Sequence, residues 1–223
     1  MAKYDFRYID CIADIHGMHQ GYSLGDTRLP ELRLEGGYML IVAGDLTANN
    51  KPQNYEAFNE WIGKQPYMHK IVIAGNHDGL LERSWVNKSV LLSNCIYLCN
   101  SGFEVDGLKI WGSPYTPKFR DWFFGATPEK LRKMWAEIPE DTDILVTHGP
   151  PAGILSQNVH GECCGCPELF ERVQEIKPKY HVFGHIHEQY GQVSDGQTTF
   201  INCSHCDEYY SPINAPIRIM LNV

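Results

Sequence analysis

Histidine, aspartate and asparagine side chains follow short apolar runs at five places in this chain. The central example is Ile71-Val72-Ile73-Ala74, which leads directly into Gly75-Asn76-His77-Asp78. An apolar run of this length is typical of a buried strand, and α/β proteins place their chemistry just beyond the carboxyl ends of such strands. Five endings of one kind predict a single polynuclear metal site. The other four are Asp14-Ile15-His16, Gly44-Asp45, Thr147-His148-Gly149 and Gly184-His185-Ile186-His187.

The candidate ligands offer only oxygen and imidazole nitrogen donors. Such ligation suits Mn²⁺, Fe²⁺ or Fe³⁺, Zn²⁺, Co²⁺ and Ni²⁺. Seven donors exceed the need of one tetrahedral ion with an open position. We therefore expect two divalent transition-metal ions, Mn²⁺ first among them, that share a bridging carboxylate. Extended backbone would place Asp14 and His16 on one side of their strand, and likewise His185 and His187. The candidate ligands are Asp14, His16, Asp45, Asn76, His148, His185 and His187.

A pair of such ions favours hydrolysis of phosphate esters. Two ions about 3.5–4 Å apart can hold a bridging water, lower its pKa and clamp both the attacking and the leaving oxygens. The expected reaction is in-line attack on phosphorus by a metal-bridging hydroxide, with an acid that protonates the leaving alkoxide. His77 is not needed as a ligand and is the predicted general acid, with Asp78 expected to orient it and to raise its pKa. Alternatively, His77 binds a phosphate oxygen as a cation.

Composition limits the classes of function. The chain has 223 residues, of which 43% are hydrophobic and 21% charged, as in an ordinary globular protein. Its net charge of −8 argues against a nucleic-acid binder. No apolar run is long enough to span a membrane, and the first residues lack the apolar core of a signal peptide. We therefore expect a cytoplasmic protein without a membrane partner, with residues 1–223 forming one domain.

The eight cysteines leave two alternatives open. Cys163, Cys164 and Cys166 are clustered, and Cys203 and Cys206 have a C-x-x-C spacing. A structural zinc site built from the two groups is one reading. Reduced, partly buried thiols are the simpler expectation for a cytosolic chain.

The elements that must position the candidate ligands are short strands and helices in alternation. The order is βαβα, then a meander, then βαβ and a hairpin, which predicts a layered α/β fold with the sheets inside. Residues 17–36 lack periodicity and are predicted to form a loop that could rim the site. Strands are predicted at 6–13, 38–43, 69–74, 96–98, 103–105, 108–111, 143–146, 180–183, 192–193, 198–202 and 217–221, with helices after Pro52, after Gly79, after Thr127 and over 167–176.

Aromatic residues gather in the middle of the chain. They could form a wall that stacks a base, or more simply a hydrophobic cap over a sheet edge. They are Trp111, Tyr115, Trp122, Phe123 and Phe124.

The five ligand runs, in this order and each at a predicted strand end, resemble the motifs of the calcineurin-like metallophosphoesterase superfamily. Longer stretches are similar to its small metallophosphoesterase-domain-containing branch, the brain-type phosphodiesterases. These stretches include Lys70–His77, Thr147–Pro151 and Asp195–Asn202. The resemblance covers nearly the whole chain and implies a four-layer α/β/β/α sandwich with two central mixed sheets.

The resemblance also implies a role for each ligand. His77 falls at the catalytic histidine of the family, and Asp78 stands where the branch often has Glu. Some animal members carry Gly where this chain keeps His185, so the retained imidazole implies a complete two-metal site. One ion would take Asp14, His16, Asp45 and His187, and the other Asp45, Asn76, His148 and His185.

The sequence thus predicts a dinuclear metal-dependent phosphoesterase for phosphodiesters, cyclic nucleotides among them, and for small phosphate esters. Its expected partner is a small phosphoester or nucleotide. A nucleotide-binding regulator with little turnover is one alternative, although it would not need both His77 and His185. A protein phosphatase or a nuclease is another. The short chain disfavours the phosphatase, and the lack of a basic stripe disfavours the nuclease.

Overall fold

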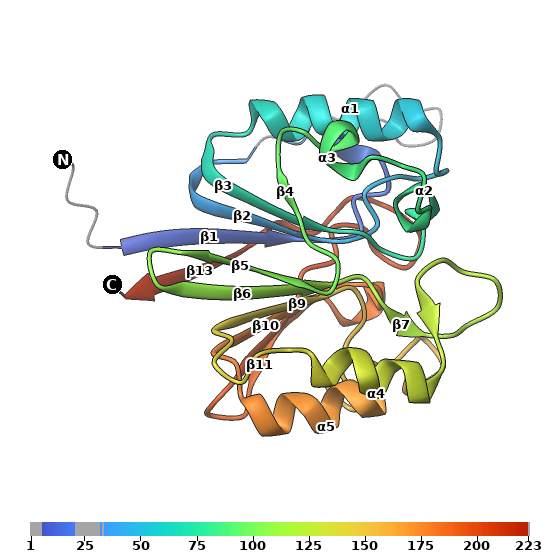
Figure 1. Cartoon of the computed structure of the whole chain (residues 1–223), viewed down its shortest axis with the longest axis vertical. Helices are drawn as coiled ribbons and strands as arrows, with labels where there is room; N and C mark the ends of the chain where they lie inside the picture. The colour runs from blue at the N-terminus through green and yellow to red at the C-terminus, as the bar shows by residue number, and fades with distance from the viewer. Residues whose placement is uncertain (1–5, 21–31, 33, 223) are drawn as a thin grey trace.

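The computed structural model describes residues 6–20, 32 and 34–222. Two β-sheets stack face to face, with helices on the outer side of each (Figure 1). This is the four-layer α/β/β/α arrangement that the sequence predicted.

The first sheet has five strands in the order β13-β1-β2-β3-β4. Strands β1 to β4 are parallel, and β13 runs antiparallel beside β1. Parallel strands point their carboxyl ends to one edge, so the three long ones end beside α2 (Figure 1). The bounds are β1 Phe6–Ile12, β2 Gly37–Ala43, β3 Tyr67–Ile73, β4 Ile96–Tyr97 and β13 Ile217–Asn222.

The second sheet has six strands in the order β11-β12-β10-β9-β6-β5. The four inner strands are parallel, and the edge strands β5 and β11 are antiparallel to their neighbours. A short parallel pair, β7 (Thr116–Pro117) with β8 (Gly125–Ala126), closes a separate loop. The sheet consists of β5 Ser101–Val105, β6 Leu108–Ser113, β9 Ile144–Thr147, β10 Tyr180–Phe183, β11 Gly191–Ser194 and β12 Thr199–Asn202.

Proline begins each of the three longer helices, where its missing N–H costs no hydrogen bond. They are α1 Pro52–Lys64, α4 Pro128–Ala136 and α5 Pro167–Ile176. Two short helices, α2 Gly79–Glu82 and α3 Lys88–Leu91, follow β3. The sequence did not predict α3 or the β7–β8 pair, since each is too short to show a period.

Three hydrophobic layers hold the sandwich together. Residues such as Ile71 and Ile201 pack between the two sheets. The predicted apolar face of α1, including Tyr55 and Phe58, covers the first sheet. Helices α4 and α5 cover the second sheet, where Trp135 is fully buried. The inner strands of each sheet are therefore buried on both faces, as their continuous apolar runs require, whereas the edge strands β5 and β11 are partly exposed.

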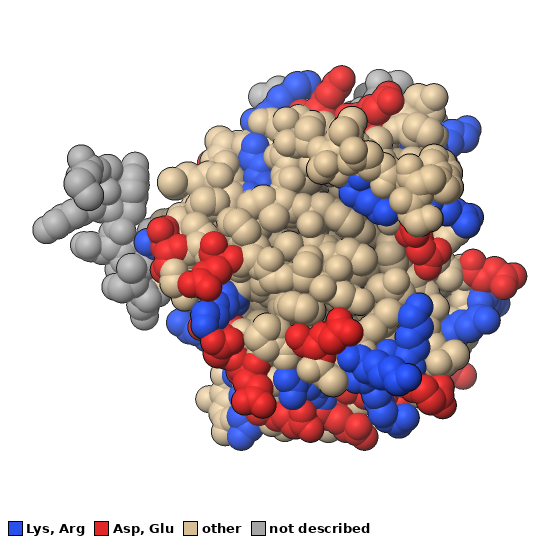
Figure 2. Space-filling view, viewed as in Figure 1, with Lys and Arg blue, Asp and Glu red and all other residues tan. Residues whose placement is uncertain are grey.

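Two further expectations concern the surface. The loop predicted to rim the site includes residues 21–31 and 33, which lie outside the described part of the chain. On the face shown in Figure 2, basic and acidic side chains are interspersed, without a continuous basic stripe.

Across residues 6–20, 32 and 34–222, no helix has the length and apolar character needed to cross a membrane.

Ile201→Ala tests the layer between the sheets. Ile201 is fully buried, so the truncation removes packed methyl groups and leaves a cavity. We expect the free energy of unfolding in urea to fall by about 2–5 kcal/mol. Ile213→Ala is the matched control, because Ile213 is 69% exposed. Equal effects of the two variants would contradict a packed layer at Ile201.

Candidate metal centre

Both sheets contribute to one cluster of polar side chains. Asp14, Asp45 and Asn76 follow β1, β2 and β3 of the first sheet, while His148 and His185 follow β9 and β10 of the second. The sheets are joined at this edge by hydrogen bonds. The His148 Nδ1–H donates to the carbonyl of Ala43 over 3.0 Å, and the His185 N–H donates to Asp14 Oδ2 over 2.8 Å. The structure therefore brings together runs that are up to 171 residues apart.

Four of the candidate ligands have left-handed backbone. Their φ values are +52° at Asp14, +46° at His16, +51° at Asp45 and +71° at His185. Such backbone in residues other than glycine costs on the order of 1–3 kcal/mol each and is concentrated at functional sites. The expectation of extended alternation was therefore wrong, since these residues lie in tight turns that begin where the strands end. The turns still direct Asp14 and His16 into one cluster.

The first half of the cluster consists of Asp14, His16 and His187. The Nε2 atom of His187 lies 3.4 Å from Asp14 Oδ1 and 3.3 Å from His16 Nε2. Its Nδ1–H donates to the carbonyl of Asp207 over 2.8 Å. That hydrogen bond directs the other ring nitrogen toward the carboxylate, as in metal-binding histidines.

The second half contains Asn76, His148 and His185. The Nε2 atom of His148 lies 2.8 Å from Asn76 Oδ1 and 3.4 Å from Asp45 Oδ2. The His185 ring packs against that of His148 with 4.9 Å between centroids. Asp45 Oδ2 also lies 3.7 Å from His16 Nε2, so one carboxylate oxygen faces both halves.

Burial opposes the charged form of every group here, and neighbouring charges decide which groups ionise. Burial is the largest single influence on Asp14, but the charge and hydrogen bond of His187 and the charge of His148 act together against it and hold the pKa of Asp14 below its usual range. Burial also acts against protonation of His148, but the Asp45 carboxylate raises the pKa of His148 to about 9. Burial lowers the pKa of His185 to about 3. Asp14 and Asp45 thus remain anionic beside the protonated imidazoles of His148 and His187, whereas His185 stays neutral.

The two carboxylates and the imidazoles beside them fit divalent cations, although His185 is in none of the groups of three described side chains that could share an ion. Asp14 Oδ1 is buried and has no hydrogen-bond partner among the described residues. A Cβ at Gly184 would overlap the Asp14 carboxylate, and one at Gly75 would overlap that of Asp45, so glycine leaves room for these oxygens. Bound cations would replace the imidazole protons, which balance the negative charge of the carboxylates in their absence. The groups of three side chains close enough to share an ion are Asp14 with His16 and His187, His16 with Asp45 and His77, and Asp14 with Asp45 and His148.

His77 lies at the edge of the cluster and is partly exposed. Its backbone N–H donates to Asp45 Oδ1 over 2.8 Å, and its ring meets that of His16 edge-on with 4.8 Å between centroids. A ring nitrogen of His77 is also close enough to join His16 and Asp45 around an ion. The geometry therefore allows His77 to meet a substrate or to bind a metal.

Asp78 has a role other than the expected one. It is fully buried, and its two carboxylate oxygens accept hydrogen bonds from the backbone N–H groups of Leu46, Thr47 and Gly75 over 2.8–3.2 Å. The Thr47 hydroxyl also donates to it, over 3.2 Å. None of the hydrogen bonds that Asp78 makes with described residues reaches the His77 ring. The expectation that Asp78 orients His77 is therefore not met. Asp78 instead ties the turn after β2 to the turn after β3.

Sequence reasoning missed the loop that follows β12. Ser204 Oγ–H donates to Asp14 Oδ2 over 2.7 Å, and the Tyr210 ring lies 4.8 Å from that of His16 and 5.2 Å from that of His187. The polar residues between Asn202 and Asp207, which follow a predicted strand, were the signal in the sequence that this loop could border the site.

The thiols do not form the alternative zinc site. All eight cysteines are free, and no three metal-binding side chains that include one are within reach of one ion in the described part of the chain. Cys203 Sγ–H donates to the carbonyl of Phe183, and Cys206 is buried. The thiols range from buried, as at Cys11 and Cys166, to exposed, as at Cys163.

The predicted aromatic wall is mostly core. Phe124 is buried against the first sheet, and Trp111 and Tyr115 pack with the layer under α4 and α5. Only Trp122 borders the metal cluster, at 5.9 Å from the His185 ring.

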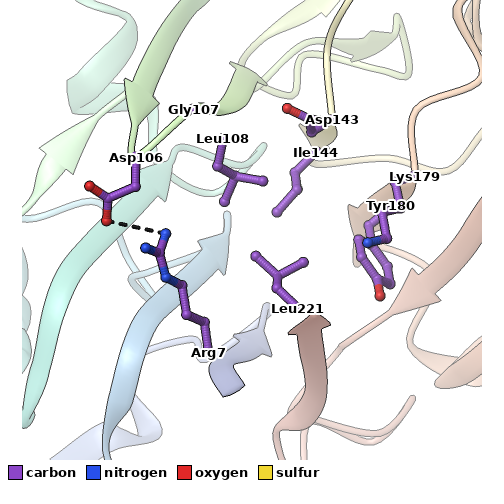
Figure 3. Close-up of a pocket in the computed structure, with 9 residues that line it drawn as sticks. All are labelled: Arg7, Asp106, Gly107, Leu108, Asp143, Ile144, Lys179, Tyr180 and Leu221. Carbon is purple, nitrogen blue, oxygen red and sulfur yellow. Dashed lines mark ion pairs between the residues drawn. The ribbon is translucent and has the colours of Figure 1, made fainter. Parts of the chain in front are cut away.

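A cavity of about 240 Å³ lies at the other edge of the sheets. It opens near the amino ends of β9 and β10, beside the Arg7–Asp106 ion pair of 3.1 Å (Figure 3). None of the candidate ligands lines it, so the metal cluster and this cavity are separate. The lining residues are Arg7, Asp106, Gly107, Leu108, Asp143, Ile144, Lys179, Tyr180 and Leu221.

Comparison with known proteins gives a consistent assignment. A family model described as calcineurin-like phosphoesterase matches residues 8–189. Human metallophosphoesterase domain-containing protein 1 is 39% identical over 242 residues, which cover 95% of this chain and 70% of that protein. A probable cyclic nucleotide phosphodiesterase of Synechococcus is 27% identical over 172 residues, covering 74% of this chain and 63% of that protein. The phosphopantetheinyl hydrolase of Mycobacterium tuberculosis has a similar fold, with a TM-score of 0.56 at 14% identity over 94% of this chain and 95% of the other.

Asp45→Asn tests the shared carboxylate. The amide keeps the size of the side chain but removes the charge that faces both halves of the cluster. We expect the metal content, measured by elemental analysis, to fall at both positions from about two ions per chain to fewer than one. Asp141→Asn is the control, because Asp141 is a surface residue paired with Lys109. Full retention of one ion in Asp45→Asn would show that Asp45 serves a single position.

Proposed function

This chain belongs to the calcineurin-like phosphoesterase family, and we propose that it is a phosphodiesterase whose candidate metal centre holds two divalent cations. The observation that carries the proposal is the position of Asp45, whose Oδ2 faces His16 on one side and His148 on the other. Both sheets contribute to this centre, so we propose that residues 1–223 act as one functional unit.

The proposed ligands divide at Asp45. Such cations, when bound, would polarise the phosphoryl group and increase the acidity of the attacking water. Mn²⁺ is the proposed ion, from a set that mixed imidazole and carboxylate donors suit and that also includes Fe, Zn, Co and Ni. One position would be held by Asp14, His16, Asp45 and His187, and the other by Asp45, Asn76, His148 and His185.

His77 is the proposed general acid. The bond from its backbone N–H to Asp45 Oδ1 fixes the residue at the centre, and partial exposure gives substrate access to the ring. From this position the imidazolium would donate its proton to the oxygen of the leaving alcohol as the P–O bond breaks. The backbone bond also couples the position of the acid to that of the shared carboxylate.

Phosphodiesters are the proposed substrates, with cyclic nucleotides among them. A phosphomonoester carries two negative charges and is commonly bound by cationic side chains. Among the described residues, the charged groups with the largest effects on the pKa values of the candidate ligands are Asp and His side chains. The similar Synechococcus protein is a probable cyclic nucleotide phosphodiesterase, which also supports cyclic nucleotides as a class to test.

Metal content and diester hydrolysis test the proposal together. We expect protein purified without added metal, then reconstituted with Mn²⁺, to hold about two ions per chain and to cleave bis(p-nitrophenyl) phosphate. Removal of the ions with a chelator should abolish cleavage, and Mn²⁺ should restore it. Two bound ions without cleavage, together with tight binding of a nucleoside monophosphate, would favour a nucleotide-binding regulator instead.

His77→Ala separates the acid from the ligands. We expect turnover of a cyclic nucleotide to fall by about 10²–10⁴-fold, because its leaving alkoxide loses its proton donor. Metal content should remain that of the wild type. His160→Ala is the control, since His160 is exposed. A parallel loss of metal and turnover in His77→Ala would identify His77 as a ligand.

A further inference from the structure

Two aromatic side chains border the metal centre from different loops. The Tyr210 ring packs against His16 and His187, which belong to the first half of the cluster. The Trp122 ring packs against His185, which belongs to the second half. Both rings also approach His77, with centroid distances of 6.1 Å from Trp122 and 6.4 Å from Tyr210. The proposed acid thus lies between the two rings.

Tyr210 is held in place by groups that also hold a candidate ligand. Its N–H donates to the carbonyl of Asp207 over 2.9 Å, and the same carbonyl accepts the Nδ1–H of His187 over 2.8 Å. The Asp207 carboxylate accepts the N–H groups of Tyr209 and Ser211 over 2.9 and 2.7 Å. Tyr210 itself has left-handed backbone, with φ of +61°. This turn directs the ring over the centre despite the conformational cost.

Trp122 is carried by a loop that is closed at its base. The strands β7 and β8 pair, and Thr116 N–H donates to the carbonyl of Phe124 over 3.0 Å. The N–H of Phe124 also donates to Glu82 Oε1 over 2.9 Å, which fixes the loop to α2. Phe124 is buried, whereas Trp122 remains 41% exposed beside the centre. The loop therefore has an anchored aromatic residue and an accessible one.

We propose that Trp122 and Tyr210 bind the planar substituents of the phosphoester, so that aryl and nucleobase-containing esters are the preferred substrate class. This inference rests on the proposed function. A phosphodiester has two substituents on phosphorus, and with phosphorus at the centre one can meet Tyr210 and the other Trp122. Planar groups gain from contact with the faces or edges of such rings, whereas a methyl group gains little.

Binding of two phosphonates tests the proposal without turnover. Phenylphosphonate and methylphosphonate present the same anionic group, and only the first has a planar substituent. We expect the Mn²⁺-loaded wild type to bind phenylphosphonate about tenfold more tightly by titration calorimetry. In Trp122→Ala or Tyr210→Ala the preference should fall at least threefold, with metal content unchanged. Tyr210→Phe should retain it, because the ring remains.

Exposed residues of the same types provide controls. Trp85 is 77% exposed and Tyr209 is 79% exposed, so Trp85→Ala and Tyr209→Ala should bind both phosphonates as the wild type does. A preference that survives both Trp122→Ala and Tyr210→Ala would overturn the proposal, as would an equal loss in the controls or in Tyr210→Phe. Loss of metal from Tyr210→Ala would assign the ring a structural role and overturn its part in binding. Failure of the metal-loaded wild type to bind either phosphonate, together with failure to cleave bis(p-nitrophenyl) phosphate, would instead refute the phosphate site of the proposed function.

A kinetic comparison uses the same variants. Bis(p-nitrophenyl) phosphate and methyl p-nitrophenyl phosphate release the same leaving group and differ only in the second substituent. We expect kcat/KM for the bis ester, divided by kcat/KM for the methyl ester, to be lower in Trp122→Ala or Tyr210→Ala than in the wild type. The change should come chiefly from a higher KM for the bis ester. A change in kcat alone, equal for both esters, would contradict a role in substrate recognition.

Discussion

Burial of two carboxylates at one sheet edge is the constraint on which the rest of the centre depends. A buried, unpaired carboxylate is strongly unfavourable, so Asp14 and Asp45 require donors or cations around them. Ser204 Oγ and the His185 N–H donate to Asp14, and the His77 N–H donates to Asp45. These donors come from both sheets and from the loop after β12. The charge of two side chains thus determines where three separate segments meet.

The backbone around the carboxylates is shaped to leave them room. Left-handed residues turn the chain sharply where strands end, and glycines at 75 and 184 carry no Cβ that would occupy the space of the oxygens. Asp78 stabilises the turns after β2 and β3, because its buried carboxylate accepts hydrogen bonds from backbone N–H groups of both turns. The hydrophobic layers on both sides of each sheet offset the cost of this strain. Rigid sheets therefore support strained, polar turns.

The proposed metal chemistry and the proposed substrate recognition belong to different parts of the fold. The candidate ligands lie at strand ends, whose positions are set by the register of the parallel strands. The aromatic rings of Trp122 and Tyr210 lie on loops that hydrogen bonds attach to α2 and to the Asp207 carbonyl. Loops of this kind can vary in sequence while the sheets remain the same. Members of one family can in this way share a metal centre and differ in substrate.

The sequence by itself determined the layers and the candidate ligands, because apolar runs and the polar residues after them are local patterns. It placed strands close to their observed bounds, including Tyr180–Phe183, and a helix over Pro167–Ile176. Only the tertiary structure decided which oxygen faces both halves, what Asp78 contacts, and that Tyr210 and Trp122 reach the centre. Those contacts join residues far apart in the chain, and they depend on turn conformation and sheet packing, which leave no periodic signal in the sequence.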